Sequence, residues 1–153
     1  MDNVDNEVTM SIVSRIPGGQ PLIDWFHGRL EFGDAEVVEL RLLRSGPSVL
    51  RIQAEISERG FYGGPPNKAA LVSFMLRNVL EVAVQGFSHQ NVIGGLRIRM
   101  AGPQQYHPTL VGIGLTTPDH EIELEPLAGA FGIIRATIEA IVVDAQPPSL
   151  GRP

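Results

Sequence analysis

The stretch that best indicates the fold is residues 50–56, Leu-Arg-Ile-Gln-Ala-Glu-Ile, in which apolar and polar side chains alternate at every step. In an extended chain, successive side chains point to opposite faces, so the apolar residues of this stretch share one face and the polar residues the other. A period of two therefore predicts a β-strand with one buried and one solvated face.

The same pattern extends outward from this stretch. Residues 36–44 alternate less regularly, and Ser45-Gly46-Pro47 separates them from residues 50–56, which predicts an antiparallel hairpin. Other alternating or apolar runs predict further strands at 8–12, 96–100, 110–115, 121–125 and 134–142. Glycine and proline mark the turns between the runs, at 17–19, 45–47, 63–66 and 117–119.

Residues 69–84 fit two interpretations. Leu71, Met75, Val79 and Val82 would share one face of a helix, whereas two alternating runs fit a strand with a bulge near Asn78. The β-branched residues and the following glycine favour the strand, with the helix as the alternative. A short helix is predicted over residues 20–27, where proline is suited to the first helical position.

These elements predict a mainly β protein, α+β at the margin. We expect an antiparallel β-sandwich or a strongly curved sheet of about eight or nine strands, with one short helix near residues 20–27. The 153 residues fit one domain, which we assign to residues 1–145. Proline-rich residues 146–153 are expected to form a flexible tail.

The composition excludes several kinds of chemistry. A net charge of −5 disfavours generic binding to nucleic acid or to an anionic membrane. The absence of cysteine excludes disulfides, thiolate metal sites and cysteine nucleophiles. No apolar run approaches the roughly 18 residues of a membrane helix, and the acidic first residues are unlike a signal peptide. We therefore expect a cytoplasmic protein.

No familiar catalytic or phosphate-binding motif occurs in the chain. The histidines are far apart in sequence, so a metal site would have to gather them from distant loops. We expect loop or surface histidines, with no metal and no cofactor. The positions concerned are His27, His89, His107 and His120.

Two polar segments are candidates for a binding surface. In one, acidic residues surround the aromatics of the predicted helix, which suits a basic protein partner; ordinary solvated acids and a general acid–base pair are the alternatives. The other is the polar loop at 86–93, which turn chemistry explains as well. The candidate partner-binding residues are Asp24, Trp25, Phe26, Asp34, Glu36, His89, Gln90 and Asn91, and of these Trp25 fits a core position better than a contact.

Three segments together resemble a known family. They are residues 21–52 (PLIDWFHGRLEFGDAEVVELRLLRSGPSVLRI), 86–98 (GFSHQNVIGGLRI) and 129–143 (GAFGIIRATIEAIVV). In this order they resemble the immunity protein 50 family of bacterial polymorphic toxin systems. The resemblance implies a cytoplasmic protein that binds a cognate toxin and blocks it by steric occlusion, without catalysis. It identifies neither the toxin nor the interface.

The chain departs from that family at one position. Family members carry a histidine directly before the Asp-Ala-Glu triplet, where this chain has Gly33. If the histidine serves the shared function, its absence puts that function in doubt. If it only caps a turn, glycine is an acceptable replacement.

Two other classes of function stay open on the sequence. A small ligand-binding domain would need a concave pocket, and a homodimeric structural domain would need a free strand edge. An enzyme would need acids or histidines with perturbed pKa values gathered in such a pocket.

Overall fold

The computed structural model describes residues 3–57, 67–102 and 118–147. Two helices come first, α1 (Asn3–Ser14) and α2 (Gly19–Trp25). Six strands follow in the described residues: β1 (Glu36–Arg41), β2 (Ser48–Ile56), β3 (Lys68–Gln85), β4 (Val92–Met100), β5 (His120–Ala128) and β6 (Phe131–Gln146). Neither helix has the length and apolar character needed to cross a membrane.

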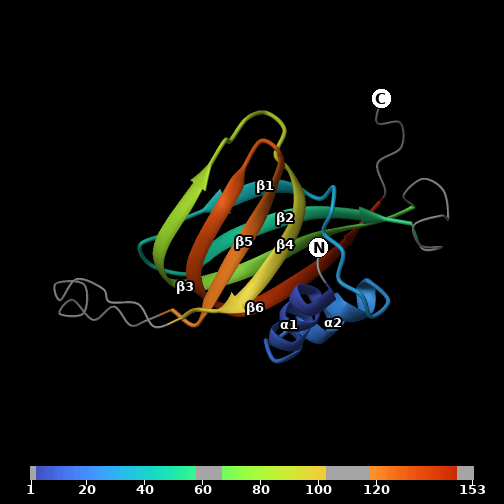
Figure 1. Ribbon diagram of the computed structural model, residues 1–153, viewed down its shortest axis with the longest axis horizontal. Helices are drawn as coiled ribbons and strands as arrows, with labels where there is room; N and C mark the ends of the chain where they lie inside the picture. Colours follow the sequence, from blue (N-terminus) through green and yellow to red (C-terminus); the bar gives the residue numbers. More distant parts are fainter. Residues whose placement is uncertain (1–2, 58–66, 103–117, 148–153) are drawn as a thin grey trace.

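The strands form one antiparallel sheet that closes into a barrel in the order β1-β2-β3-β6-β5-β4. Each half of the chain contributes a three-stranded meander, β1-β2-β3 and β4-β5-β6. The long strands β3 and β6 pair along most of their lengths and join the two meanders on one side. The helices lie together against the barrel beside β4 and β6 (Figure 1).

The other seam, between β1 and β4, is short, with one register pair at Glu36 and Val92. Farther along β4, the backbone of Ile98 bonds to a side chain of α1 instead of to a strand. The Thr9 hydroxyl oxygen accepts the Ile98 N–H at 3.0 Å and donates to the Ile98 carbonyl at 3.4 Å. Helix α1 therefore satisfies backbone groups that an open strand edge would leave exposed.

The inward-facing side chains fill the barrel. Apolar residues of all six strands belong to one cluster, which the inner faces of α1 and α2 and the chain after α2 extend. Three aromatic rings line up through it, with centroid distances of 5.0 Å between Phe26 and Phe32 and 6.3 Å between Phe32 and Phe74. The interior is thus a packed core in which side chains occupy the space, as small barrels allow.

Several predicted elements are confirmed. The hairpin around residues 45–47 is β1 and β2, and residues 69–84 belong to the strand β3. The register of β3 against β6 shifts between Arg77 and Glu81, and Asn78 has a φ of 52°, so the irregularity lies where the bulge is predicted. The short helix predicted over 20–27 is α2.

Other predictions are wrong. The described residues hold six strands in a single closed sheet, so neither the sandwich nor the count of eight or nine strands is correct. Residues 8–12 belong to helix α1, whose buried residues Thr9, Ile12 and Val13 are spaced as on one face of a helix. Because one buried residue of that face is the polar Thr9, a count of apolar residues alone does not reveal the helical period.

Three further predictions fall at or beyond the limits of the described residues. Gln146, the first residue of the predicted tail, still pairs with Ala69 in the sheet. Residues 148–153, the strand predicted at 110–115 and the turn predicted at 63–66 lie outside the described residues.

Candidate functional site

Residues 24–36, here called the acidic segment, run from the end of α2 to the start of β1. Phe26, Leu30 and Phe32 are buried in the core and anchor the segment from below. The chain turns sharply after α2, where His27 and Gly28 have φ values of 58° and 88°. Because the buried residues alternate with polar ones, the segment presents its acids outward while its backbone follows the core.

The carboxylates of this segment have no cation partner among the described residues. Asp24 accepts a hydrogen bond from the Gln20 amide at 2.9 Å, and Glu31 accepts the Gly33 backbone N–H at 2.9 Å. The Gln20 amide and the Gly33 N–H carry no net charge, so these bonds do not neutralise the carboxylates of Asp24 and Glu31. The four acids are Asp24, Glu31, Asp34 and Glu36.

The two candidate aromatics have different environments. Phe26 is only 5% exposed and packs against other rings, so we reassign it from the predicted contact surface to the core. Trp25 is partly exposed and stacks edge-on against Phe26, with ring centroids 4.8 Å apart. The Lys68 ammonium lies 4.7 Å from the centre of the Trp25 ring and donates to the Trp25 carbonyl at 2.7 Å. Trp25 is therefore held by neighbours on both sides.

The polar loop between β3 and β4 is organised by one of its own residues. The Asn91 Oδ1 accepts the backbone N–H groups of Ser88 at 2.9 Å and of Ala130 at 3.1 Å, and its Nδ2 donates to the Ser88 carbonyl at 2.9 Å. Asn91 thus fastens the loop to the neighbouring β5–β6 turn, which is a structural task. His89 and Gln90 are exposed and stay available to a partner.

The structure brings only some of the predicted site residues together. Asp34 donates its N–H to the Ile93 carbonyl, and the carbonyl of Asn91 accepts the N–H of Val37, so the end of the acidic segment adjoins the polar loop. Asp24 and Trp25 lie at the other end of the segment, where Trp25 contacts Lys68 of β3. The acidic segment therefore connects two groups of candidates that share no direct contact.

Position 33 lies within this segment. The N–H of Gly33 donates to the Glu31 carboxylate, and a Cβ at this position would approach that carboxylate oxygen to 2.8 Å. Glycine lets the Glu31 side chain fold over its own backbone, and a larger residue here would require it to move.

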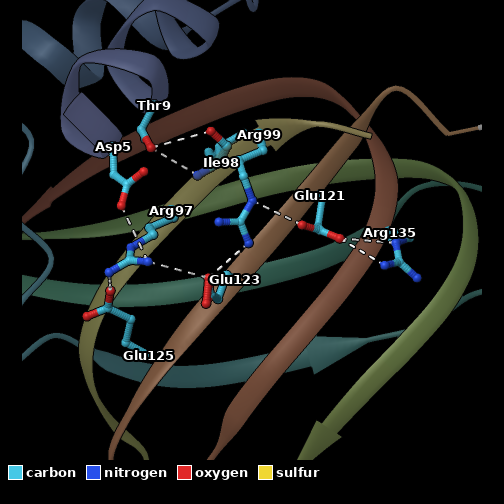
Figure 2. A network of polar contacts seen from close by, with 9 residues as sticks. All are labelled: Asp5, Thr9, Arg97, Ile98, Arg99, Glu121, Glu123, Glu125 and Arg135. Atoms are coloured by element: carbon cyan, nitrogen blue, oxygen red, sulfur yellow. Dashed lines mark hydrogen bonds and ion pairs between the residues drawn. The ribbon is translucent and has the colours of Figure 1, made fainter. Parts of the chain in front are cut away.

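A second charged region, which sequence reasoning did not select, lies on the outer face of β4, β5 and β6 (Figure 2). We call it the charged ladder. It consists of Arg97, Arg99, Glu121, Glu123, Glu125 and Arg135.

Every rung of the ladder joins opposite charges. Arg99 bonds to Glu121 at 3.1 Å and to Glu123 at 2.9 Å, and Arg135 bonds to the other oxygen of Glu121 at 3.0 Å. Arg97 lies 2.5 Å from Glu125, and 3.5 Å from Asp5 on α1. Arg135 also pairs with Glu81 of β3. The network thus ties four strands and one helix together.

The sheet register produces this pairing. Arg97 lies opposite Glu123, and Glu121 lies between Arg99 and Arg135 on the two adjacent strands. Burial opposes the charge on Arg99, but its bonds to Glu123 and Glu121 outweigh that cost and raise its pKa. The alternating acids and arginines were visible as solvated strand faces, but their pairing depends on which strands become neighbours.

A cleft of about 370 Å³ opens where the α1–α2 turn meets β3, β5 and β6. His120 lines it and is 8% exposed, so the prediction of a loop or surface histidine is wrong at this position. The His120 Nδ1 accepts the Ile138 backbone N–H at 3.0 Å, which places the proton of the neutral ring on Nε2. Burial lowers the pKa of His120; nearby Asp119 opposes this and Arg15 adds to it.

The described residues contain no group of three or more histidine, aspartate or glutamate side chains placed to hold a metal ion. Comparison of the chain with family models, with curated proteins and with solved structures finds no match.

Proposed function

We propose that this chain is an immunity-type binding protein, which neutralises a bacterial toxin in the cytoplasm by covering it and performs no reaction itself. The observation that supports this proposal is the acidic segment, in which carboxylates that pair with no cation of the described residues lie on a well-anchored part of the fold. The resemblance to the immunity protein 50 family suggests the class of partner. The contact residues we propose are Asp24, Glu31, Asp34 and Glu36, with His89 and Gln90 at one end.

A surface contact suits this fold better than binding inside the barrel. Large apolar side chains such as Phe74, Leu50 and Ile134 are fully buried in the interior, so a ligand has no room between the strands. A packed barrel is also rigid, and a rigid surface loses little conformational entropy on binding a protein. The acids would meet a basic toxin surface and speed its association, an effect that salt weakens.

The proposal is tested by capturing partners of the tagged protein from its host at low and moderate salt, with matched variants. D24N/D34N removes two exposed charges from the acidic segment, and asparagine tolerates the positive φ of position 34. E7Q/D144N removes two exposed charges elsewhere. We expect a partner carrying a toxin domain to bind the wild type and E7Q/D144N, and to be weakened by D24N/D34N.

Function is then measured directly by expressing the captured toxin domain in a bacterium with each version of the protein. Rescue of growth by the wild type, and poorer rescue by D24N/D34N, would support the proposal. If no toxin domain is captured from cells that make one, or if E7Q/D144N weakens rescue as much as D24N/D34N, the proposal is wrong.

A second candidate function is the binding of a small ligand. It is favoured by the cleft beside His120, whose volume falls in the lower range of ligand sites.

A further inference from the structure

Two arginines line the cleft beside His120, and neither is paired with a carboxylate of the described residues. Arg15, in the α1–α2 turn, and Arg77, on β3, both line it. Arg15 donates from Nε to the Ser11 carbonyl at 3.2 Å, and no ion pair with a described residue involves either arginine. By contrast, the arginines of the charged ladder are all paired. Arginine presents a fork of N–H donors that matches a carboxylate.

The histidine of the same cleft, His120, is oriented by the backbone. Its Nδ1 is occupied by the Ile138 N–H, so the neutral ring has only the Nε2–H left to donate. No described residue accepts a hydrogen bond from that nitrogen. Thr137, the residue before Ile138, accepts the backbone N–H of Asp119 at 3.1 Å and so fixes the start of β5. The imidazole is thus a hydrogen-bond donor of fixed orientation, in a cleft whose two arginines pair with no carboxylate in the described part of the chain.

The charges of the cleft limit what it accepts. Two acids, Asp119 and Glu139, also line it, and neither lies within 4 Å of a cationic group of Arg15 or Arg77. The charges of the two arginines and the two acids sum to zero, and the neutral histidine adds no charge at pH 7. A single negative charge placed at the arginines is therefore favourable, whereas a second would be repelled by the acids.

We propose that this cleft binds a small organic molecule through one carboxylate, which Arg15 and Arg77 hold and to which the His120 Nε2–H donates. This inference is independent of the acidic segment and of toxin binding. The cleft supplies binding and orientation, and no bond of the ligand is made or broken.

The experiment is a titration of the whole chain followed by NMR, with acetate as the monoanionic probe and phosphate as the comparison, at constant ionic strength. We expect acetate to shift the imidazole signals of His120 and the amide of Ile138 along a saturable curve, with phosphate weaker. R15M/R77M is expected to weaken acetate binding about tenfold or more, since it removes both charge-assisted contacts. R44M removes an exposed arginine outside this cleft and should leave the affinity unchanged.

A third variant, H120N, tests the Nε2–H donor of the imidazole while keeping an acceptor for the Ile138 N–H. Its amide oxygen replaces Nδ1 as acceptor for the Ile138 N–H, while the Nε2–H donor is lost, so weaker binding with an unchanged spectrum elsewhere supports the assigned role. Because Arg77 is exposed, R77M alone provides a folded variant if the double variant unfolds. Non-saturable shifts in the wild type, or equal acetate affinity in wild type, R77M and R15M/R77M, would overturn the proposal.

Discussion

The charged ladder and the acidic segment both carry charge on the outside of the same barrel, but the fold treats them differently. In the ladder, each arginine lies within ion-pair distance of a glutamate on a neighbouring strand. In the acidic segment, four carboxylates lie within thirteen residues of sequence and none pairs with a cation among the residues described. Neighbouring strands place facing Cβ atoms about 5 Å apart, so that oppositely charged side chains on them can meet, whereas the acidic segment adjoins strand β4 only at its end.

The difference shows which charges remain available to a partner. The ladder stabilises the sheet and presents a largely neutralised surface. The carboxylates of the acidic segment are expected to contribute little to folding and keep their negative potential. A count of charged residues along the chain does not separate the two regions, because the separation depends on strand register. The four predictions that follow test this contrast.

The largest effect is expected at Thr9, next to the ladder. Thr9→Val keeps the shape of the side chain but leaves the Ile98 N–H and carbonyl without their partner in a buried place. We expect a loss of about 1–3 kcal/mol in the free energy of unfolding, measured by urea denaturation. Thr9→Ser retains the hydroxyl and should lose less. A loss in Thr9→Val no larger than that in Thr9→Ser would contradict a leading role for the two hydrogen bonds.

The next largest effect is expected within the ladder. Glu121→Ala removes the carboxylate that joins Arg99 to Arg135, each of which keeps one other partner. Because these side chains are partly exposed, the expected loss is about 1–2 kcal/mol, below that of a fully buried pair. Urea denaturation measures it. A loss no greater than that of Asp24→Ala would remove the distinction between the two regions.

A pH-dependent effect is expected at His120. Because burial lowers its pKa in the folded state, the folded protein binds fewer protons than the unfolded chain just below the ordinary histidine pKa of about 6.5. Stability should therefore fall as the pH drops through that value, by at most about 1.4 kcal/mol per pH unit. Thermal or urea unfolding between pH 8 and 5.5 measures the slope. H120N should show a flatter profile, and an identical one would contradict this assignment.

The smallest effect on stability is expected in the acidic segment. D24N/D34N should change the free energy of unfolding by less than about 0.5 kcal/mol, because both side chains are exposed and neither forms an ion pair with another described residue. Urea denaturation against the wild type checks this. A destabilisation as large as that of Glu121→Ala would mean that these acids serve the fold and are not free for a partner.

The parts of the fold that follow from local pattern were predictable. The alternation at residues 50–56 predicts β2, and the β-branched residues of 69–84 favour β3 over a helix. Helix α1 was not predictable from the same counting, because Thr9 is part of its buried face. The closed barrel was not predictable either, since it depends on pairing between strands that are distant in sequence, such as β1 with β4.

The candidate site, like the fold, was predictable only in part. Sequence showed the acids near Trp25 and the polar loop at 86–93, and both are at the surface. Local pattern allowed Asn91 to bond the backbone of its own loop, but its bond to Ala130 of the β5–β6 turn and the near-complete burial of Phe26 depend on contacts made after folding. The cleft at His120 left no signal in the sequence, since Arg15, Arg77 and His120 come from three separate elements.

The amino-acid sequence alone specifies the individual strands, the acidic character and the order of polar and apolar faces, because these depend on residues within a few positions of one another. Folding in three dimensions specifies the closure of the barrel, the pairing of the ladder and the charges that remain unpaired. The reason is physical: side-chain period is a local property, whereas ion pairs and clefts depend on distances between segments that come together only when the core is packed.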